Sequence, residues 1–348
     1  MIQKFISPND LMRTSQETLK QIANEFGKTI NANTSELVAS IWEEREKEKF
    51  KSVLDKHIDY LFAHRGSYVC YKVNKGNLTS MVKKELAPLL NKKITLKHND
   101  IGNEPEIVGV YKLKEEEYLV KVTYLVKYEN RIENDDVIKI PIIEQTNVLI
   151  DTKNDVVEIR TNFKISRKII NFFHQLDNDI VFENVKIEKD NIIRNLDATM
   201  TSSKGYTIGA DINLDDEGKL AIERIITFID NALEDGSQNL EYSVLIEQID
   251  KLRQQEEVNN FVLLLINGLG KLDLGSIFDD EKKEDLNKNS LYNLVKPYLE
   301  PNTMYLTVPF TDGVVEYFTI NVGLEKNVIT YLSTPNEKLI RHIRSKIL

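Results

Sequence analysis

This chain of 348 residues has one cysteine, five histidines and no long apolar run, and each shortage excludes a class of protein. Because Cys70 is alone, the chain forms no intramolecular disulfide and no cysteine-rich metal cluster, which favours a reducing compartment. The longest apolar run, FVLLLI at 261–266, is much too short to cross a bilayer. The first residues lack the apolar segment of a secretory signal. We therefore expect a cytoplasmic protein without a membrane partner.

Charge is unevenly distributed along the chain. The formal net charge is -9, which argues against uniform coating of a nucleic acid. Residues 1–100 nevertheless hold 17 Lys or Arg and 12 Asp or Glu, a balance of +5, so the remaining 248 residues carry -14. Any polyanion contact is therefore expected near the N-terminus.

The order of patterns along the chain predicts an α+β fold. Strand patterns cluster and do not alternate regularly with helices, which favours α+β over a doubly wound sheet. We expect three domains: an N-terminal helical module at 1–65, a β-rich antiparallel domain at 66–165, and an α+β domain at 166–348.

Two helical patterns stand in the first domain. Thr14 and Glu17 have capping-box spacing, and the apolar periodicity that follows ends at Gly27. The second pattern begins at Asn33, with Glu36 three residues on, and continues to Leu61 as one long helix or as two helices joined by a bend.

Five alternating segments between residues 106 and 160 predict an antiparallel meander with one buried face. The polar stretches ENRIENDD and DTKND are expected as turns, and Pro141 at an edge or bulge. A helix is expected at 166–176, two more at 218–236 and 242–266, and a mobile loop at 279–289. Three strands and an amphipathic terminal helix close the chain.

The opening helices carry a resemblance to a known family. Residues 14–45 resemble a SAP-type helix–extended loop–helix module, which is a small nucleic-acid-binding fold. The matching residues are Leu19, Ile22, Phe26, Gly27, Ser35, Glu36, Leu37, Val38 and Ile41.

The resemblance implies contacts with DNA phosphates at the start of the second helix. Free backbone N–H groups and the positive end of the dipole favour anions there. The expected nucleic-acid-binding residues are Lys20, Lys28, Asn31, Asn33, Thr34 and Ser35, with Lys83, Lys84, Lys92 and Lys93 extending the positive surface. The alternatives are a hairpin that packs on the rest of the chain and one that binds another protein.

Enzymatic signals are sparse. Asp151, Asp155 and Glu158 surround a predicted hairpin and are the best candidates for the ligands of a divergent metal-dependent nuclease. Arg160 stands where such a nuclease offers a lysine, and arginine does not readily transfer a proton. No catalytic motif, metal-ligand spacing or cofactor motif is present.

The leading hypothesis is a non-enzymatic DNA-binding or DNA-associated subunit, with a protein partner or homo-oligomer as the assembly. A role in microbial genome maintenance or antiviral defence would suit it. The alternatives are a nuclease and an interaction scaffold that binds no nucleic acid.

Overall fold

The computed structural model describes residues 2–92, 94, 102, 104–133, 136–206 and 301–348 and confirms the α+β class. The chain divides into two compact units, one formed by residues 1–198 and 308–348 and the other by residues 199–307. Within the described residues, no helix combines the length and apolarity needed to cross a membrane. The predictions for 207–300 and for Lys93 lie outside the described residues.

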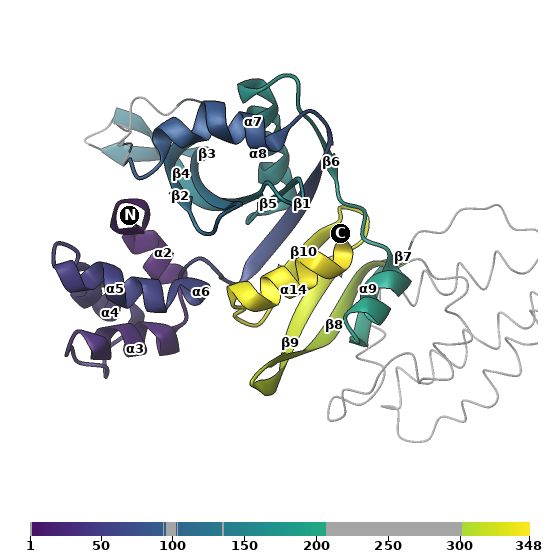
Figure 1. Ribbon diagram of the computed structural model, residues 1–348. Helices are drawn as coiled ribbons and strands as arrows, with labels where there is room; N and C mark the ends of the chain where they lie inside the picture. Colours follow the sequence, from purple (N-terminus) through teal and green to yellow (C-terminus); the bar gives the residue numbers. More distant parts are fainter. Residues whose placement is uncertain (1, 93, 95–101, 103, 134–135, 207–300) are drawn as a thin grey trace, which may run out of the picture. The chain divides into compact units, whose positions relative to one another are not determined.

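The first unit opens with six short helices (Figure 1). They are α1 (Ile2–Phe5), α2 (Pro8–Arg13), α3 (Gln16–Glu25), α4 (Thr34–Trp42), α5 (Glu48–Lys56) and α6 (Ile58–Leu61). The segment from Asn33 to Leu61, expected as one long helix or two, therefore contains three helices. The sequence patterns missed α1 and α2, although Pro8 at the first turn of α2 is a typical helix start.

Two of the expected helix boundaries can be checked at their caps. The cap of α3 is Ser15, one residue after the expected Thr14, because the Ser15 hydroxyl accepts from the Thr18 N–H at 3.2 Å. Asn33 and Glu36 form the expected capping box of α4. Gly27 follows α3 with φ +70°, a left-handed conformation that glycine adopts without strain.

Seven strands of the first unit form one antiparallel sheet in the order β2-β3-β4-β5-β1-β10-β9, and β6 pairs with β1. Their bounds are β1 (Gly66–Lys75), β2 (Glu106–Lys112), β3 (Glu117–Glu133), β4 (Asp136–Asp151), β5 (Val156–Ile159), β6 (Val181–Asn184), β9 (Val314–Gly323) and β10 (Val328–Tyr331). Consecutive strands β2 to β5 are neighbours, which confirms the predicted meander.

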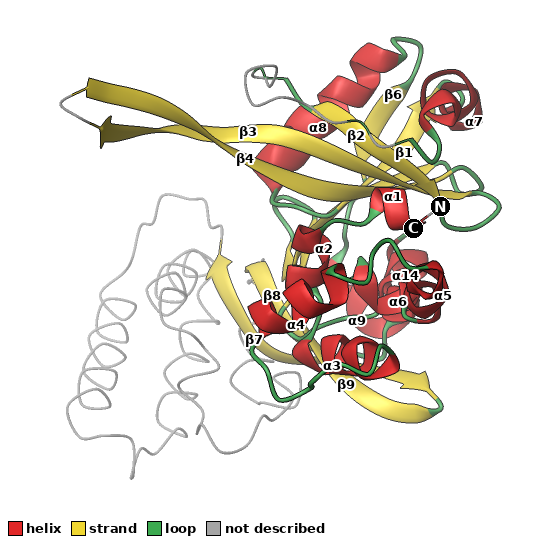
Figure 2. Cartoon of the chain, turned by 90° about the vertical axis from the view of Figure 1, so that its left-hand side faces the viewer, coloured by secondary structure: helices red, strands yellow, loops and turns green. Residues whose placement is uncertain are grey.

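The prediction of a turn over ENRIENDD was wrong for most of that stretch. Strand β3 continues to Glu133 and β4 begins at Asp136, so the two strands form a ribbon that extends far beyond their neighbours (Figure 2). Polar residues there reflect exposure to solvent and not a change of chain direction. Pro141 lies in β4 outside the part that pairs with β5, at an edge as expected.

Helices cover both faces of the sheet. Because side chains of a strand alternate between faces, Leu119 of β3 packs in the core of the N-terminal helices while Val120 packs in the opposite core. The opposite core includes α7 (Leu78–Met81), the π-helical turn Val82–Leu86 and α8 (Phe163–Leu176). The contacts place residues 1–65 and the sheet in one unit, because Leu119 and Leu149 of the sheet complete the core of these helices.

The last described helices complete the first unit. Helix α9 (Lys189–Asn195) follows β6, and α14 (Glu337–Ile347) buries Leu339, Ile340 and Ile343. In the second unit the described residues form an antiparallel pair of β7 (Thr199–Tyr206) with the first part of β8 (Pro301–Asp312).

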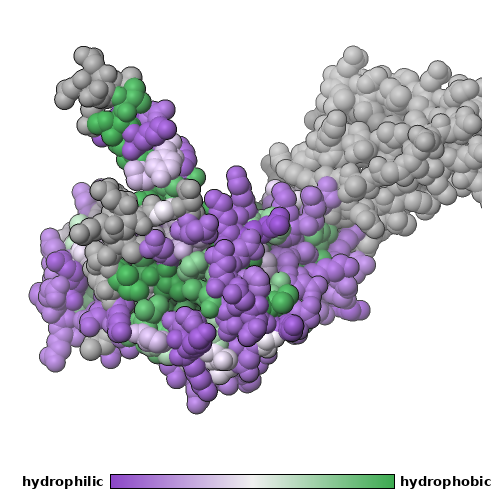
Figure 3. Space-filling model, turned by 90° about the horizontal axis from the view of Figure 1, so that it is seen from above, coloured by the Kyte–Doolittle hydropathy of each residue, from purple (hydrophilic) through white to green (hydrophobic). Residues whose placement is uncertain are grey.

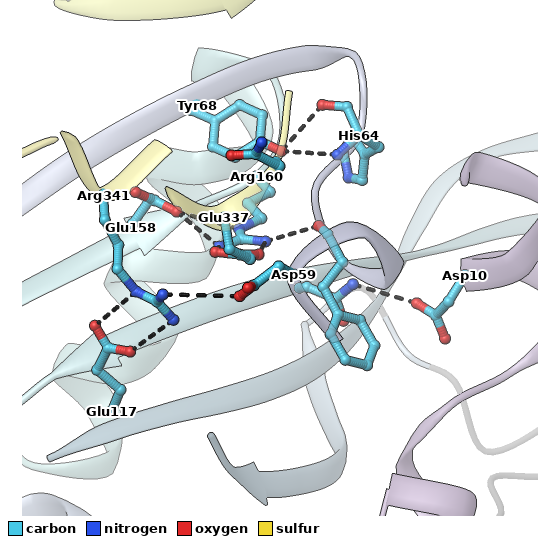
Figure 4. Close-up of polar contacts among 12 residues, drawn as sticks. Asp10, Asp59, His64, Tyr68, Glu117, Glu158, Arg160, Glu337 and Arg341 are labelled. Atoms are coloured by element: carbon cyan, nitrogen blue, oxygen red, sulfur yellow. Dashed lines mark hydrogen bonds and ion pairs between the residues drawn. The ribbon is translucent and has the colours of Figure 1, made fainter. Parts of the chain in front are cut away.

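Arg160, directly after β5, joins three segments of the first unit (Figure 4). Its fully buried guanidinium makes a bidentate pair with Glu337 at the start of α14, one of whose bonds measures 2.9 Å. It also donates to the Phe62 carbonyl at 2.7 Å and to Glu158 at 3.1 Å. Burial alone would raise the pKa of Glu337, but the charge and hydrogen bonds of Arg160, together with the charges of Arg341 and Arg344, hold that pKa below its ordinary value.

A second buried ion pair ties the N-terminal helices to the sheet. Lys121 of β3 contacts the carboxylate of Asp10 in α2, and both side chains are almost fully buried. The amide of Asn147 in β4 donates to the same carboxylate at 3.2 Å. The position of α2 on the sheet is therefore set by polar contacts as well as by apolar packing.

Replacing Arg160 with methionine is expected to lower the free energy of unfolding by about 3–5 kcal/mol, because Glu337 is left buried without its counter-charge. Glu158 is less affected, since Arg344 still donates to it at 3.0 Å. Urea denaturation of the full chain measures the loss. The double variant Arg160→Met with Glu337→Leu should recover much of it. Lys338→Met, in an exposed pair with Asp312, is the matched control and should change little.

Candidate functional site

An open pocket of about 570 Å³ lies in the first unit, at the ends of several helices and strands. The residues that line it are almost all of polar types, although their carbon atoms supply about as much of the surface as their polar atoms do. The residues are Arg13, Thr14, Ser15, His64, Arg65, Gly66, Ser67, Tyr124, Glu144, Gln145, Thr146, Arg160, Thr161, Asn162 and Thr334. We call it the arginine pocket, because three of its side chains are guanidinium groups.

Two helices begin at the arginine pocket. Ser15 is the N-cap of α3, and Asn162 is the N-cap of α8, where its side chain accepts from the Ile165 N–H at 3.1 Å. The two helices have 10 and 14 residues, long enough for the partial positive charge of their N-termini to develop. Two such ends at one pocket favour an anionic ligand.

Arg13 and Arg65 bring positive charge to the pocket. Arg13 ends α2 and donates to the Gln145 carbonyl at 2.9 Å, and Arg65 donates to the Thr334 hydroxyl at 3.3 Å. Both side chains are exposed, and within the described residues neither lies within ion-pair distance of a carboxylate. Their remaining N–H groups are therefore available to a ligand.

The other charged side chains of the pocket are already engaged. Arg160 is held by Glu337 and Glu158, so its charge is compensated from inside the protein. Glu144 is the carboxylate among the lining residues, and it accepts from the Tyr124 hydroxyl at 3.1 Å. Arg13 and Arg65 thus outnumber Glu144, whose negative charge the Tyr124 hydroxyl does not neutralise, and the lining keeps an excess of positive charge.

His64 offers a different kind of contact. Its Nδ1 lies 2.9 Å from the Arg65 carbonyl oxygen, so Nδ1 carries the hydrogen and Nε2 is an acceptor. Nε2 is hidden from solvent and has no hydrogen-bond partner among the described residues. Burial, aided by the positive charges of Arg13 and Arg160, lowers the pKa of His64 to about 4. The ring is therefore neutral near pH 7.

The predicted contact residues on the opening hairpin are partly engaged within it. Lys28 pairs with Glu43 at 3.3 Å and with Glu44 at 3.0 Å, and these hydrogen bonds, that of Glu44 first, raise the pKa of Lys28. Asn33 and Glu36 already satisfy each other at the start of α4. Of the remaining positions, Asn31 and Ser35 are exposed, and Lys20 and Thr34 are half-buried.

The other predicted basic residues are not brought to the same face. Lys83 and Lys84 are exposed on the π-helical turn whose Val82 and Leu86 pack in the core with α8. The opening hairpin packs in the core on the other side of the sheet. Lys92, which is exposed, follows this turn in sequence and is not among the lining residues of the arginine pocket.

The three carboxylates of the nuclease hypothesis serve structural roles. Asp151 accepts from the Lys153 and Asn154 N–H groups, each at 3.1 Å, and so caps the β4–β5 turn. Glu158 is bound by Arg160 and Arg344, and Asp155 is a turn residue with φ +52°. Among the described residues, no three His, Cys, Asp or Glu side chains gather as metal ligands would.

Sequence reasoning missed the arginine pocket because its parts are far apart in the chain. Arg13 stands two residues before the cap of α3, which is a local hint, but Arg65 and Asn162 reach it only through the fold. Neither a known family model nor a curated protein matches the chain. The resemblance to the SAP-type module therefore stays a prediction.

The pKa of His64 predicts how stability depends on pH. In the folded chain this pKa is about 4, below its ordinary value of 6.5, so only the unfolded chain binds the proton between those pH values. The neutral His64 ring therefore lowers the free energy of unfolding of the chain only below pH 6.5, and this loss grows as the pH falls toward 4. When the pH is lowered from 7 to 5, the free energy of unfolding should fall by about 2 kcal/mol less in His64→Asn than in the wild type. Urea titrations at both pH values test this, and an unchanged difference would contradict it.

Proposed function

We propose that this chain is a DNA-binding subunit that binds the phosphate backbone at the arginine pocket. The observation that carries the proposal is the convergence of Arg13, Arg65 and the starts of α3 and α8 on one pocket. Phosphate oxygens accept hydrogen bonds from guanidinium groups in a bidentate manner and are favoured at helix N-termini.

The pocket also suits the uncharged part of a nucleotide. Its volume of about 570 Å³ lies within the range of small-ligand sites, which is room for a nucleotide unit.

Charge sets the expected strength of binding. A net charge of -9 keeps polyanions away from most of the surface, and two free arginines contact only a few phosphates. Since each phosphate contact releases less than one counterion, the affinity should be modest and its salt dependence shallow. Binding of this kind suits a subunit of a larger assembly, in genome maintenance or antiviral defence, more than a protein that coats DNA.

Fluorescence anisotropy with labelled single- and double-stranded DNA across a salt series tests the proposal. Arg13→Gln with Arg65→Gln should weaken binding at low salt at least about tenfold and reduce the slope of log affinity against log salt by roughly 1.4–1.8. The matched control is Lys83→Gln with Lys84→Gln, which removes the same charge from the opposite face of the sheet.

A third variant separates the pocket from the opening hairpin. Lys20→Gln with Lys28→Gln should leave most of the affinity, because Lys28 is already paired with two carboxylates. If this variant loses more affinity than the arginine variant, the hairpin and not the pocket is the DNA contact. If the full chain binds neither DNA at low salt, DNA binding itself is wrong.

A further inference from the structure

The ribbon of β3 and β4, which we call the arm, leaves both of its outer edges without a strand partner in the described chain. Strand β2 pairs with β3 only as far as Thr123, and β5 pairs with β4 only from Val148. Beyond these points the two strands pair with each other alone. Isolated two-stranded ribbons are marginally stable in water, and an open edge is a template for another strand.

The arm also carries apolar side chains into solvent. The exposed fractions are 41% for Val126, 53% for Tyr128, 64% for Val137 and 42% for Ile138. Figure 3 shows the arm leaving the body with apolar side chains beside polar ones along its length. A monomer gains nothing from apolar side chains at the end of an arm, so they indicate a contact with another protein surface.

The two edges of the arm differ in their capacity to pair. The outer edge of β4 contains Pro141, which lacks an N–H and interrupts a ladder. The segment 127–133 of β3 contains no proline and follows the bulge between Leu125 and Lys127. At about 3.4 Å per residue it offers roughly 24 Å of regular strand. The β3 edge is therefore the one suited to a new strand.

The sequence of that edge, KYENRIE, is complementary to itself when read antiparallel. A twofold axis at Asn130 places Glu129 of one chain opposite Arg131 of the other and Lys127 opposite Glu133. The same axis places Tyr128 opposite Ile132. By sequence, this register sets each charged position against one of opposite charge and position 128 against position 132, both apolar, which is the order that stabilises cross-strand pairs. Glu129, which pairs with Lys127 of its own strand at 2.6 Å, would then also meet Arg131 of the second chain.

We propose that a second copy of this chain pairs with the β3 edge of the arm, antiparallel and centred on Asn130, to form a four-stranded sheet across the dimer axis. Charged side chains usually discourage pairing at a sheet edge, but on this edge the signs alternate so that two antiparallel copies attract each other. The interface is isologous, as expected for a homodimer. It does not depend on the arginine pocket.

A nucleic acid fits the arm less well than a second copy does. Residues 126–144 contain three basic and five acidic residues, so the arm is not a basic ribbon for a DNA groove. Binding to an unrelated protein would not require residues 127–133 to be complementary to themselves, so it would not explain their order of charges. The experiment below separates these occupants.

Sedimentation velocity of the full chain over a dilution series tests the proposal. The wild type should dimerise. Glu129→Lys alone and Arg131→Glu alone each place like charges opposite each other twice per dimer, and should raise the dissociation constant roughly tenfold or more. The double variant E129K with R131E restores the opposite charges and should dimerise like the wild type. Glu316→Lys, an exposed change on β9, is the control and should have no effect.

Mixing the two single variants gives a second, independent readout. A chain with E129K and a chain with R131E present complementary edges to each other, so the mixture should form heterodimers while each variant alone stays mostly monomeric. A wild type that is monomeric at every concentration would overturn the proposal. So would a dimer that neither single variant weakens, or single variants that neither the double variant nor the mixture rescues.

Discussion

The buried guanidinium of Arg160 is the constraint on which the first unit depends. A charge removed from water must find hydrogen-bond acceptors in fixed directions, and Arg160 finds them on Glu337, Glu158 and the Phe62 carbonyl. These acceptors belong to the C-terminal helix, the sheet and the segment after the N-terminal helices. The beginning, middle and end of the chain must therefore meet at one point before the charge is satisfied.

This meeting point also shapes the arginine pocket. Arg160 forms part of the pocket lining, while the segment that supplies the Phe62 carbonyl continues directly into His64 and Arg65. Holding that segment fixes where the two ligand-facing side chains stand. The internal pairing of Arg160 leaves the positive charge for a ligand to Arg13 and Arg65. One buried ion pair thus contributes to stability and to the composition of the site.

Unlike the buried Arg160 ion pair, the arm gains little stability from contacts within its own chain. Its residues from Val126 to Arg131 are exposed, so neither core stabilises them directly. Selection for stability alone does not explain a ribbon of this length, and its apolar and charged residues are ordered in a way that favours a second copy of the chain. Pairing through the arm would bring two arginine pockets into one particle and let two phosphate contacts act together.

Local sequence patterns were enough to predict the α+β class, the helical start, the antiparallel meander, the capping box of Asn33 and the stop at Gly27. These features follow from local periodicity and from interactions between residues three or four positions apart. The prediction of a turn at ENRIENDD failed, because a run of polar residues indicates exposure to solvent and does not distinguish a turn from a strand that extends away from the sheet. Nor does the sequence indicate that Leu119 of the sheet packs in the core of the helices at 1–65, since its apolar side chain suits either face of the sheet equally.

Which charged side chains are compensated within the protein depends on long-range contacts. In the sequence Lys28 and Arg13 are equivalent cations, and Glu158 and Asp151 are equivalent carboxylates. The fold pairs Lys28 with two glutamates and Glu158 with two arginines, while it turns Arg13 and Arg65 toward one pocket. Electrostatic function depends on distances between residues far apart in the chain, and those distances exist only once the chain has folded.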